Sequence, residues 1–116
     1  MHRGRGGREG RQGYHYINES LYGSVDPAKP TALLYEDGED GVRRLVGAEW
    51  IVPATDAKTP RPTLFGQDFE GPTPGHNAAM PTYYDVHAWI WKSNPSGMFA
   101  PWNPTVKCPA PGAPGI

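Results

Sequence analysis

The sequence predicts an all-β domain, a small antiparallel β-barrel or sandwich with one short helical turn and long Pro/Gly-rich loops. Residues 83–91 are the densest aromatic and aliphatic run, and they separate into two faces with a period of two. Two further β-type runs, residues 31–36 and 42–52, flank a polar, glycine-bearing loop of hairpin length. The 15 Gly and 14 Pro gather at the ends and in one long connection, which leaves a folded centre.

The chain length of 116 residues predicts one domain with a core of modest size. Residues 1–12 are Gly/Arg-rich and predict a disordered arm, because no apolar side chain follows Met1. The arm either contacts RNA or another polyanion, or is an extension without a role. Residues 13–108 form the β domain, and residues 109–116 a mobile Pro/Gly tail.

The first half of the domain alternates strands and turns. Residues 13–17 predict the first strand, because Tyr and Ile are good strand formers. Residues 18–23 fit one helical turn, with Asn18 as the N-cap and Gly23 as the C′ residue. Residues 31–36 predict the second strand.

The third predicted strand, residues 42–52, ends at Pro53. Both of its faces are apolar enough for the sheet interior, yet Glu49 lies on one of them. Residues 53–82 form a long Pro/Gly-rich connection, and such connections are more often functional or packed as a lid than idle. Within it, residues 64–69 predict a short edge strand or an apolar plug.

Residues 83–91 predict a central strand with neighbours on both sides. One face is a plain core face, made of Tyr84, Val86, Ala88 and Ile90. The other sets an acid and an imidazole among large aromatics: Tyr83, Asp85, His87, Trp89 and Trp91.

The composition of the chain argues against several classes of function. The net charge of −1 argues against a generally basic nucleic-acid binder, so nucleic acid is expected only at the Gly/Arg arm. Cys108 is the single cysteine, so no intrachain disulfide forms. No apolar run approaches a membrane span, and no h-region of a signal peptide follows the basic start. No glycine-rich loop joins a strand to a helix, so no nucleotide cofactor is expected.

Three polar residues fall on separate predicted strands and suggest a metal site. His15, Glu49 and His87 would make a His₂Glu set, which suits Zn²⁺ or Fe²⁺ with positions open for water or substrate. His76, on the long connection, could close the shell and would favour copper or zinc. Asp85 could be a further ligand or could orient His87. The expected activity is metal-dependent hydrolysis or redox chemistry, with Glu49 and His87 as catalytic residues.

A structural role for the same residues is the competing interpretation. The motifs H-x-H, H-E-x-x-H and C-x-x-C are all absent. Glu49 could instead bond a backbone amide or pair with Arg43 or Arg44. Burying its charge without a partner would cost about 3 kcal/mol or more, so a cation or a protonated histidine is the expected companion.

The tryptophans support a different class of function. Trp89, Trp91 and Trp102 could stack carbohydrate or another planar ligand in a non-catalytic, exported binding module. Core packing is the alternative, and we favour it for Trp50 and for at least one of Trp89 and Trp91.

Several motifs occur in a distinctive order. They read Gly-x-His-Tyr-Ile-Asn, Asp-Pro-x-x-Pro, Leu-x-Tyr-Glu, Glu-Trp, Leu-Phe-Gly-Gln, Val-His-x-Trp-x-Trp-Lys, Asn-Pro-x-Gly-Met-Phe and Asn-Pro-x-Val-x-Cys, at residues 13–18, 26–30, 33–36, 49–50, 64–67, 86–92, 94–99 and 103–108. This order resembles a family of small, uncharacterised, usually exported bacterial proteins. The resemblance implies export and a compact β fold, and brings no established activity. Family members generally have a longer N-terminal region, often with a cysteine that is a plausible disulfide partner for the residue matching Cys108.

Overall fold

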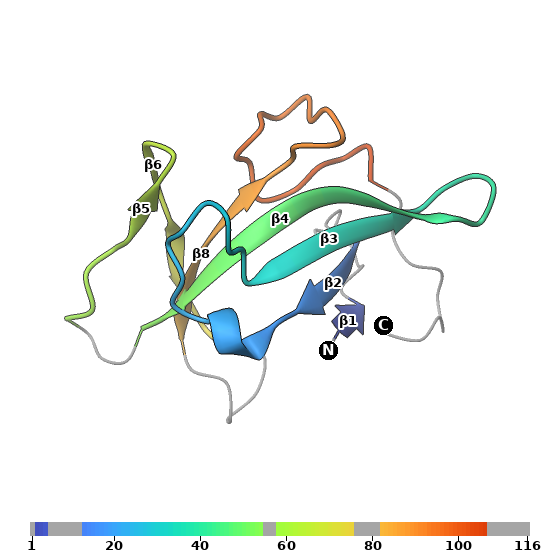
Figure 1. The fold of residues 1–116 in the computed structure, drawn as a ribbon. Helices are drawn as coiled ribbons and strands as arrows, with labels where there is room; N and C mark the ends of the chain where they lie inside the picture. The colour runs from blue at the N-terminus through green and yellow to red at the C-terminus, as the bar shows by residue number, and fades with distance from the viewer. Residues whose placement is uncertain (1, 5–12, 55–57, 76–81, 107–116) are drawn as a thin grey trace.

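The computed structural model describes residues 2–4, 13–54, 58–75 and 82–106. The fold is nearly all-β and every strand pairing is antiparallel, which confirms the predicted class (Figure 1). Six strands form one sheet in the order β1-β2-β3-β4-β8-β7, with β1 and β7 at its two edges, and β5 and β6 form a separate hairpin. The strands are β1 His2–Gly4, β2 Tyr14–Ile17, β3 Ala32–Asp37, β4 Arg43–Pro53, β5 Thr63–Leu64, β6 Gln67–Asp68, β7 Glu70–Thr73 and β8 Tyr83–Ala88.

Strands β2, β3 and β4 begin and end within one residue of their predicted bounds. The predicted helical turn is the 3-10 helix Glu19–Leu21, where the Asn18 side chain accepts a hydrogen bond from the Ser20 amide. In the described part of the chain, no helix has the length and hydropathy needed to cross a membrane.

The N-terminal arm differs from the prediction in one part. His2–Gly4 pair with β2 as strand β1, where the sequence predicts disorder. An antiparallel partner satisfies the edge of β2, which would otherwise present unpaired backbone groups. The rest of the arm, and the tail at residues 109–116, lie outside the described residues.

Strand β8 lies between β4 and β7, so it has the predicted neighbours on both sides. Its predicted end at residue 91 is wrong, because the strand stops at Ala88. The Trp89 amide bonds the Met98 carbonyl at 2.9 Å, and the Trp91 amide bonds the Val46 carbonyl at 3.2 Å. These bonds turn the chain into a loop, and Ile90 and Trp91 are consequently exposed instead of alternating between two faces.

Among the described residues, the core has two clusters. The larger contains Ala48, Trp50, Phe69, Tyr84, Val86 and Ala88, with Leu64 packed against it. Phe69 and Leu64 therefore act as the predicted apolar plug, brought onto the sheet by the β5–β6 hairpin. The other cluster contains Leu34, Val46, Trp89 and Val106.

The segment after β8 folds back along the sheet (Figure 1), and polar contacts hold it there. Lys92 Nζ donates to both carboxylate oxygens of Glu36, at 2.6 and 2.8 Å, and to the Thr105 carbonyl. The buried Asn103 side chain donates to the Ser93 carbonyl at 3.0 Å. These contacts hold the segment that brings Trp102 beside β8.

Gly47 on β4 is required by close packing, and its substitution gives a first prediction. A Cβ atom there would lie 2.9 Å from the Ala88 carbonyl oxygen and 3.1 Å from the Trp89 ring. We expect Gly47→Ala to destabilise the fold by about 1–3 kcal/mol, because the backbone of β8 has to move. Urea unfolding should show a lower midpoint with an unchanged m-value. An unchanged midpoint would contradict this packing.

Candidate metal centre

Three strands supply the polar side chains that the sequence singled out. His15 lies on β2, Glu49 on β4 and His87 on β8. Glu49 and His87 are direct partners across the β4–β8 ladder, so both side chains point to the same face of the sheet. Their proximity therefore follows from the register of these two strands.

His15 reaches this pair across the intervening strand β3. The β3 residue directly opposite Glu49 is Ala32, which on its other side pairs with Ile17. Because strands two apart in a sheet are separated by roughly 10 Å, long side chains meet only over a small residue. Ala32 leaves room beside Glu49, while the β3 residue directly opposite His15 is Leu34, so the His15–Glu49 contact runs diagonally across β3.

The resulting cluster is tight and buried, as predicted. His15 Nε2 lies 3.2 Å from Glu49 Oε1, and His87 Nε2 lies 3.5 Å from Glu49 Oε2. One candidate ligand atom from each residue lies within 4.8 Å of the other two. All three side chains are at most 1% exposed.

The polar side chains nearest to Glu49 are these histidines and not arginine. Among the described residues, neither Glu49 oxygen accepts a hydrogen bond of good geometry. Arg43 pairs with Asp37 at 3.0 Å, and Arg44 pairs with Asp40. The predicted alternative of a Glu49–arginine pair is therefore wrong, and a buried carboxylate is left facing two imidazoles.

Arg43 belongs to a separate polar group near the end of β3. It also donates to the Tyr16 hydroxyl at 2.8 Å and lies over the Tyr14 ring. Burial, and then the hydrogen bond to Asp37, raise the pKa of the Tyr14 hydroxyl above its usual value. Tyr14 therefore remains a neutral donor at physiological pH.

His87 is framed by an acid and an aromatic ring. Its Nδ1 atom lies 3.8 Å from Asp85 Oδ2, on the side of the ring away from the Nε2 contact with Glu49. The Trp89 ring lies nearly parallel to the imidazole, with the ring centres 6.2 Å apart. Trp89 is itself held by a 2.7 Å hydrogen bond from its indole N–H to the Ala100 carbonyl. Asp85 thus lies beside the imidazole, at a distance longer than a direct hydrogen bond.

A cavity of about 290 Å³ reaches the cluster from the His87 side. Its lining includes Glu70 and Thr73 from β7, Tyr83, Asp85 and His87 from β8, and Trp102 from the returning segment. The buried cluster is therefore adjacent to a space that a small molecule can occupy.

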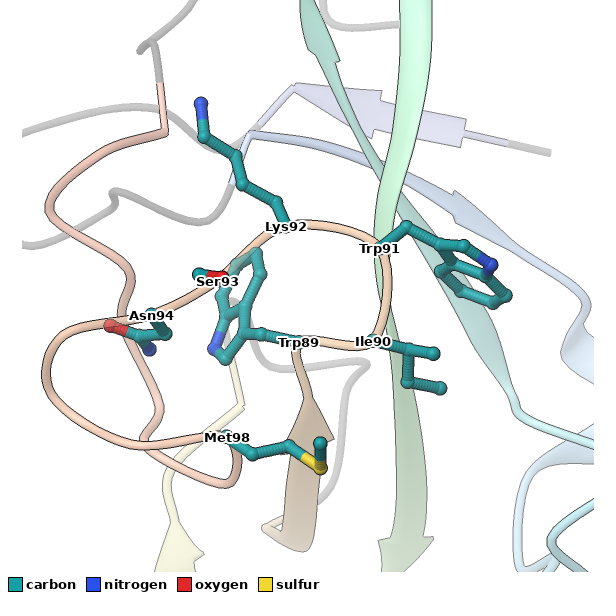
Figure 2. A pocket seen from close by; sticks show the side chains of 7 residues that line it. All are labelled: Trp89, Ile90, Trp91, Lys92, Ser93, Asn94 and Met98. Atoms are coloured by element: carbon teal, nitrogen blue, oxygen red, sulfur yellow. The ribbon is translucent and has the colours of Figure 1, made fainter.

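The three tryptophans proposed for ligand stacking occupy different environments. Trp89 is 2% exposed, so it is a core residue and is not available to a ligand. Figure 2 shows its indole turned into the loop toward Ser93, whereas Ile90 and Trp91 project from the opposite side. That loop lines a second, open cavity of about 370 Å³, to which Trp89 and Trp91 contribute and His87 does not. Trp102, 42% exposed, is the one of the three that lines the cavity beside the cluster.

Two sequence predictions cannot be placed, and one residue was missed. His76, the predicted fourth ligand, and Cys108 lie outside the described residues. Glu70 was not singled out, although it lies directly opposite Asp85 in the β7–β8 ladder. No local signal marks it, because its position depends on the register of a strand that follows a long loop.

No protein-family model, no curated protein and no solved structure matches this chain. The functional conclusion therefore rests on the geometry and chemistry of the His15–Glu49–His87 cluster.

Proposed function

We propose that this protein binds one divalent metal ion, Zn²⁺ or Fe²⁺, through His15, Glu49 and His87. The observation that supports the proposal is the buried Glu49 carboxylate between two imidazole nitrogens at 3.2 and 3.5 Å. Zinc bonds of roughly 2.0–2.1 Å place tetrahedral ligand atoms about 3.3–3.4 Å apart. Each contact is close to that edge length, but the two involve different oxygens of Glu49, Oε1 for His15 and Oε2 for His87. With one ligand atom from each residue the separations reach up to 4.8 Å, and these would shorten on binding.

The donor set selects the class of metal. Two imidazole nitrogens and one carboxylate oxygen suit zinc or ferrous iron, whereas calcium and magnesium prefer all-oxygen ligands. Three protein ligands leave coordination positions for water and substrate, as in catalytic sites. The cavity beside His87 gives a route for both.

We infer that the activity is metal-dependent hydrolysis or oxidation–reduction. A bound metal ion would supply Lewis acidity or a redox centre. Glu49 and His87 then act as ligands, and the Asp85 carboxylate, 3.8 Å from His87 Nδ1, favours the ring orientation that presents Nε2 to the metal. Tight packing around these side chains, including the parallel Trp89 ring, limits their rotation before the metal binds.

Elemental analysis of protein purified without a histidine tag tests the proposal. We expect about one zinc or iron per chain in the wild type, and a loss of roughly tenfold or more in His87→Ala, because only two protein ligands would remain for the ion. Glu36→Gln is the matched control, since Glu36 is also a buried carboxylate but is bound by Lys92 outside the cluster.

Circular dichroism spectra should show that both variants remain folded. Sub-stoichiometric metal in the wild type that does not fall further in His87→Ala would show that the cluster is a purely structural imidazole–carboxylate network.

A further inference from the structure

We propose that, besides water, the metal centre admits only a neutral diatomic molecule, dioxygen or nitric oxide, to the coordination positions that its three protein ligands leave open. This inference rests on the proposed function and names the class of molecule that reaches the metal. Its support is the way in which the protein encloses the cluster.

The three ligand side chains are closed off from solvent. Those of His15, Glu49 and His87 are each at most 1% exposed. Of these residues only His87 lines the cavity of about 290 Å³, and none of them lines the larger cavity at the loop after β8. A molecule in either of these two cavities therefore touches at most one ligand residue, and not the metal position between all three.

The His87 imidazole separates its cavity from the metal position. Its Nδ1 atom lies 3.8 Å from Oδ2 of Asp85, which also lines the cavity. Its Nε2 atom lies 3.5 Å from Oε2 of Glu49. A molecule in the cavity meets the ring from the Asp85 side, so the ring itself lies between that molecule and the ion.

Ile51 closes the path beside the ring. It lies directly opposite Asp85 in the β4–β8 ladder and two residues from Glu49 on β4, so its side chain is on the same face of the sheet as both. It is also buried. The branched side chain of Ile51 therefore stands between the cavity wall at Asp85 and the Glu49 carboxylate.

The β3 side of the enclosure is apolar. Ala32 lies opposite Glu49 and Leu34 lies opposite His15, and both are buried. A close-packed interior has few voids larger than a water molecule, and a polar or charged molecule that enters it loses its hydrogen bonds to water. A neutral diatomic molecule is small and loses no such bonds. The enclosure thus favours a gas over a larger organic substrate at the metal.

Nitric oxide and 4-nitrocatechol test this size limit, because both bind ferrous iron that they can reach and they differ in size. Chelator-treated protein is loaded with Fe²⁺ without oxygen, and its iron content is measured first. We expect the electron paramagnetic resonance signal of an iron–nitrosyl complex with nitric oxide, and no change in the visible absorption of 4-nitrocatechol. A shift of that absorption, or iron-loaded protein without a nitrosyl signal, would overturn the proposal.

Ile51→Ala should open the enclosure, so the absorption change that is absent in the wild type is expected to appear. Ile51→Val removes less volume, keeps the fold more securely and should give a smaller change. Val86→Ala is the matched control, since Val86 is a buried aliphatic residue of the same ladder but packs in the larger core cluster on the other face. The nitrosyl signal shows that each variant is folded and loaded. Exclusion of 4-nitrocatechol by all three variants would contradict the role of Ile51 as the barrier.

The outcomes separate this inference from the proposed function. Protein that binds neither zinc nor iron removes both. Bound iron that 4-nitrocatechol reaches, or uptake of zinc but not of iron, removes the diatomic ligand and leaves the metal centre in place. Exposure of the ferrous protein to air distinguishes the two gases. Oxidation of Fe²⁺ to Fe³⁺, with the electron passing to dioxygen, assigns dioxygen, whereas stable Fe²⁺ that still binds nitric oxide assigns nitric oxide.

Discussion

Zinc added to chelator-treated wild-type protein is expected to raise its melting temperature by about 15 °C. The reason is that the metal binds the folded chain, where His15, Glu49 and His87 are already within 4.8 Å of one another, and not the unfolded chain. Free metal at 1,000 times its dissociation constant stabilises the fold by about 4 kcal/mol. In a domain of this size, each kcal/mol moves the melting temperature by about 4 °C or more.

Glu49→Gln should lose this zinc-dependent shift, because it removes the one anionic ligand of the cluster. Glu36→Gln should retain the shift, since Lys92 and not the cluster binds Glu36. Thermal unfolding, monitored by circular dichroism with and without zinc, measures the melting-temperature shift of each variant. An equal shift in the wild type and in Glu49→Gln would place zinc elsewhere on the protein.

The chelator-treated samples give a second comparison. If the cluster were only a structural ion network, Glu49→Gln would destabilise the protein by about 3–5 kcal/mol whether or not metal is present. In a metal centre, most of the difference between the wild type and Glu49→Gln appears only after zinc is added. The dependence on zinc, and not the size of the destabilisation, therefore distinguishes the two.

Trp50→Ala is expected to destabilise the fold by about 3–5 kcal/mol. Trp50 is 1% exposed in the larger core cluster and contacts the Phe65 ring edge-on at 5.1 Å. Its indole N–H also bonds the Asp26 carbonyl at 2.9 Å. The substitution creates a large cavity and leaves that carbonyl without its donor, so the effect combines a packing loss with a lost hydrogen bond.

Trp91→Ala serves as the control for Trp50→Ala, because Trp91 is 54% exposed. Its stability should stay within about 0.5 kcal/mol of the wild type. Urea unfolding of the three proteins gives the comparison. Equal losses in the two variants would mean that Trp50 does not pack in the core as described.

The loss of stability in Trp50→Ala also concerns the candidate metal centre, because β4 contributes side chains to both faces of the sheet. Trp50 points into the larger cluster, while its neighbour Glu49 points to the opposite face and into the candidate metal centre. The packing of Trp50 on one face of the sheet therefore fixes the position of the Glu49 carboxylate on the other face. We expect loss of Trp50 to weaken metal binding indirectly, by lowering the folded population.

Local sequence patterns were enough to predict much of the fold and of the candidate site. The alternation of side chains in residues 42–52 predicted β4 and placed Glu49 on an apolar face, since successive side chains of a strand point to opposite sides. The Asn18 cap signalled the helical turn in the same way. His15 and His87 stood out because a titratable side chain in an otherwise aromatic or aliphatic strand is costly to bury without a partner.

The remaining features of the fold depend on interactions between segments that are distant in the sequence. The end of β8 at Ala88 is set by bonds from the loop after it to Met98 and Val46, which no local pattern encodes. The pairing of Glu70 with Asp85 depends on the strand register that follows a long Pro/Gly-rich connection.

By itself, the sequence determined the all-β class, most strand positions and the three side chains that needed a buried partner, because these follow from local spacing and residue chemistry. Only the tertiary structure decided that the three side chains meet. It did so through the register that pairs Glu49 with His87 and the register of β2, β3 and β4 that places His15, opposite Leu34, diagonally across from Glu49. Register arises from pairing between remote segments, and a shift of one residue would turn each side chain to the other face.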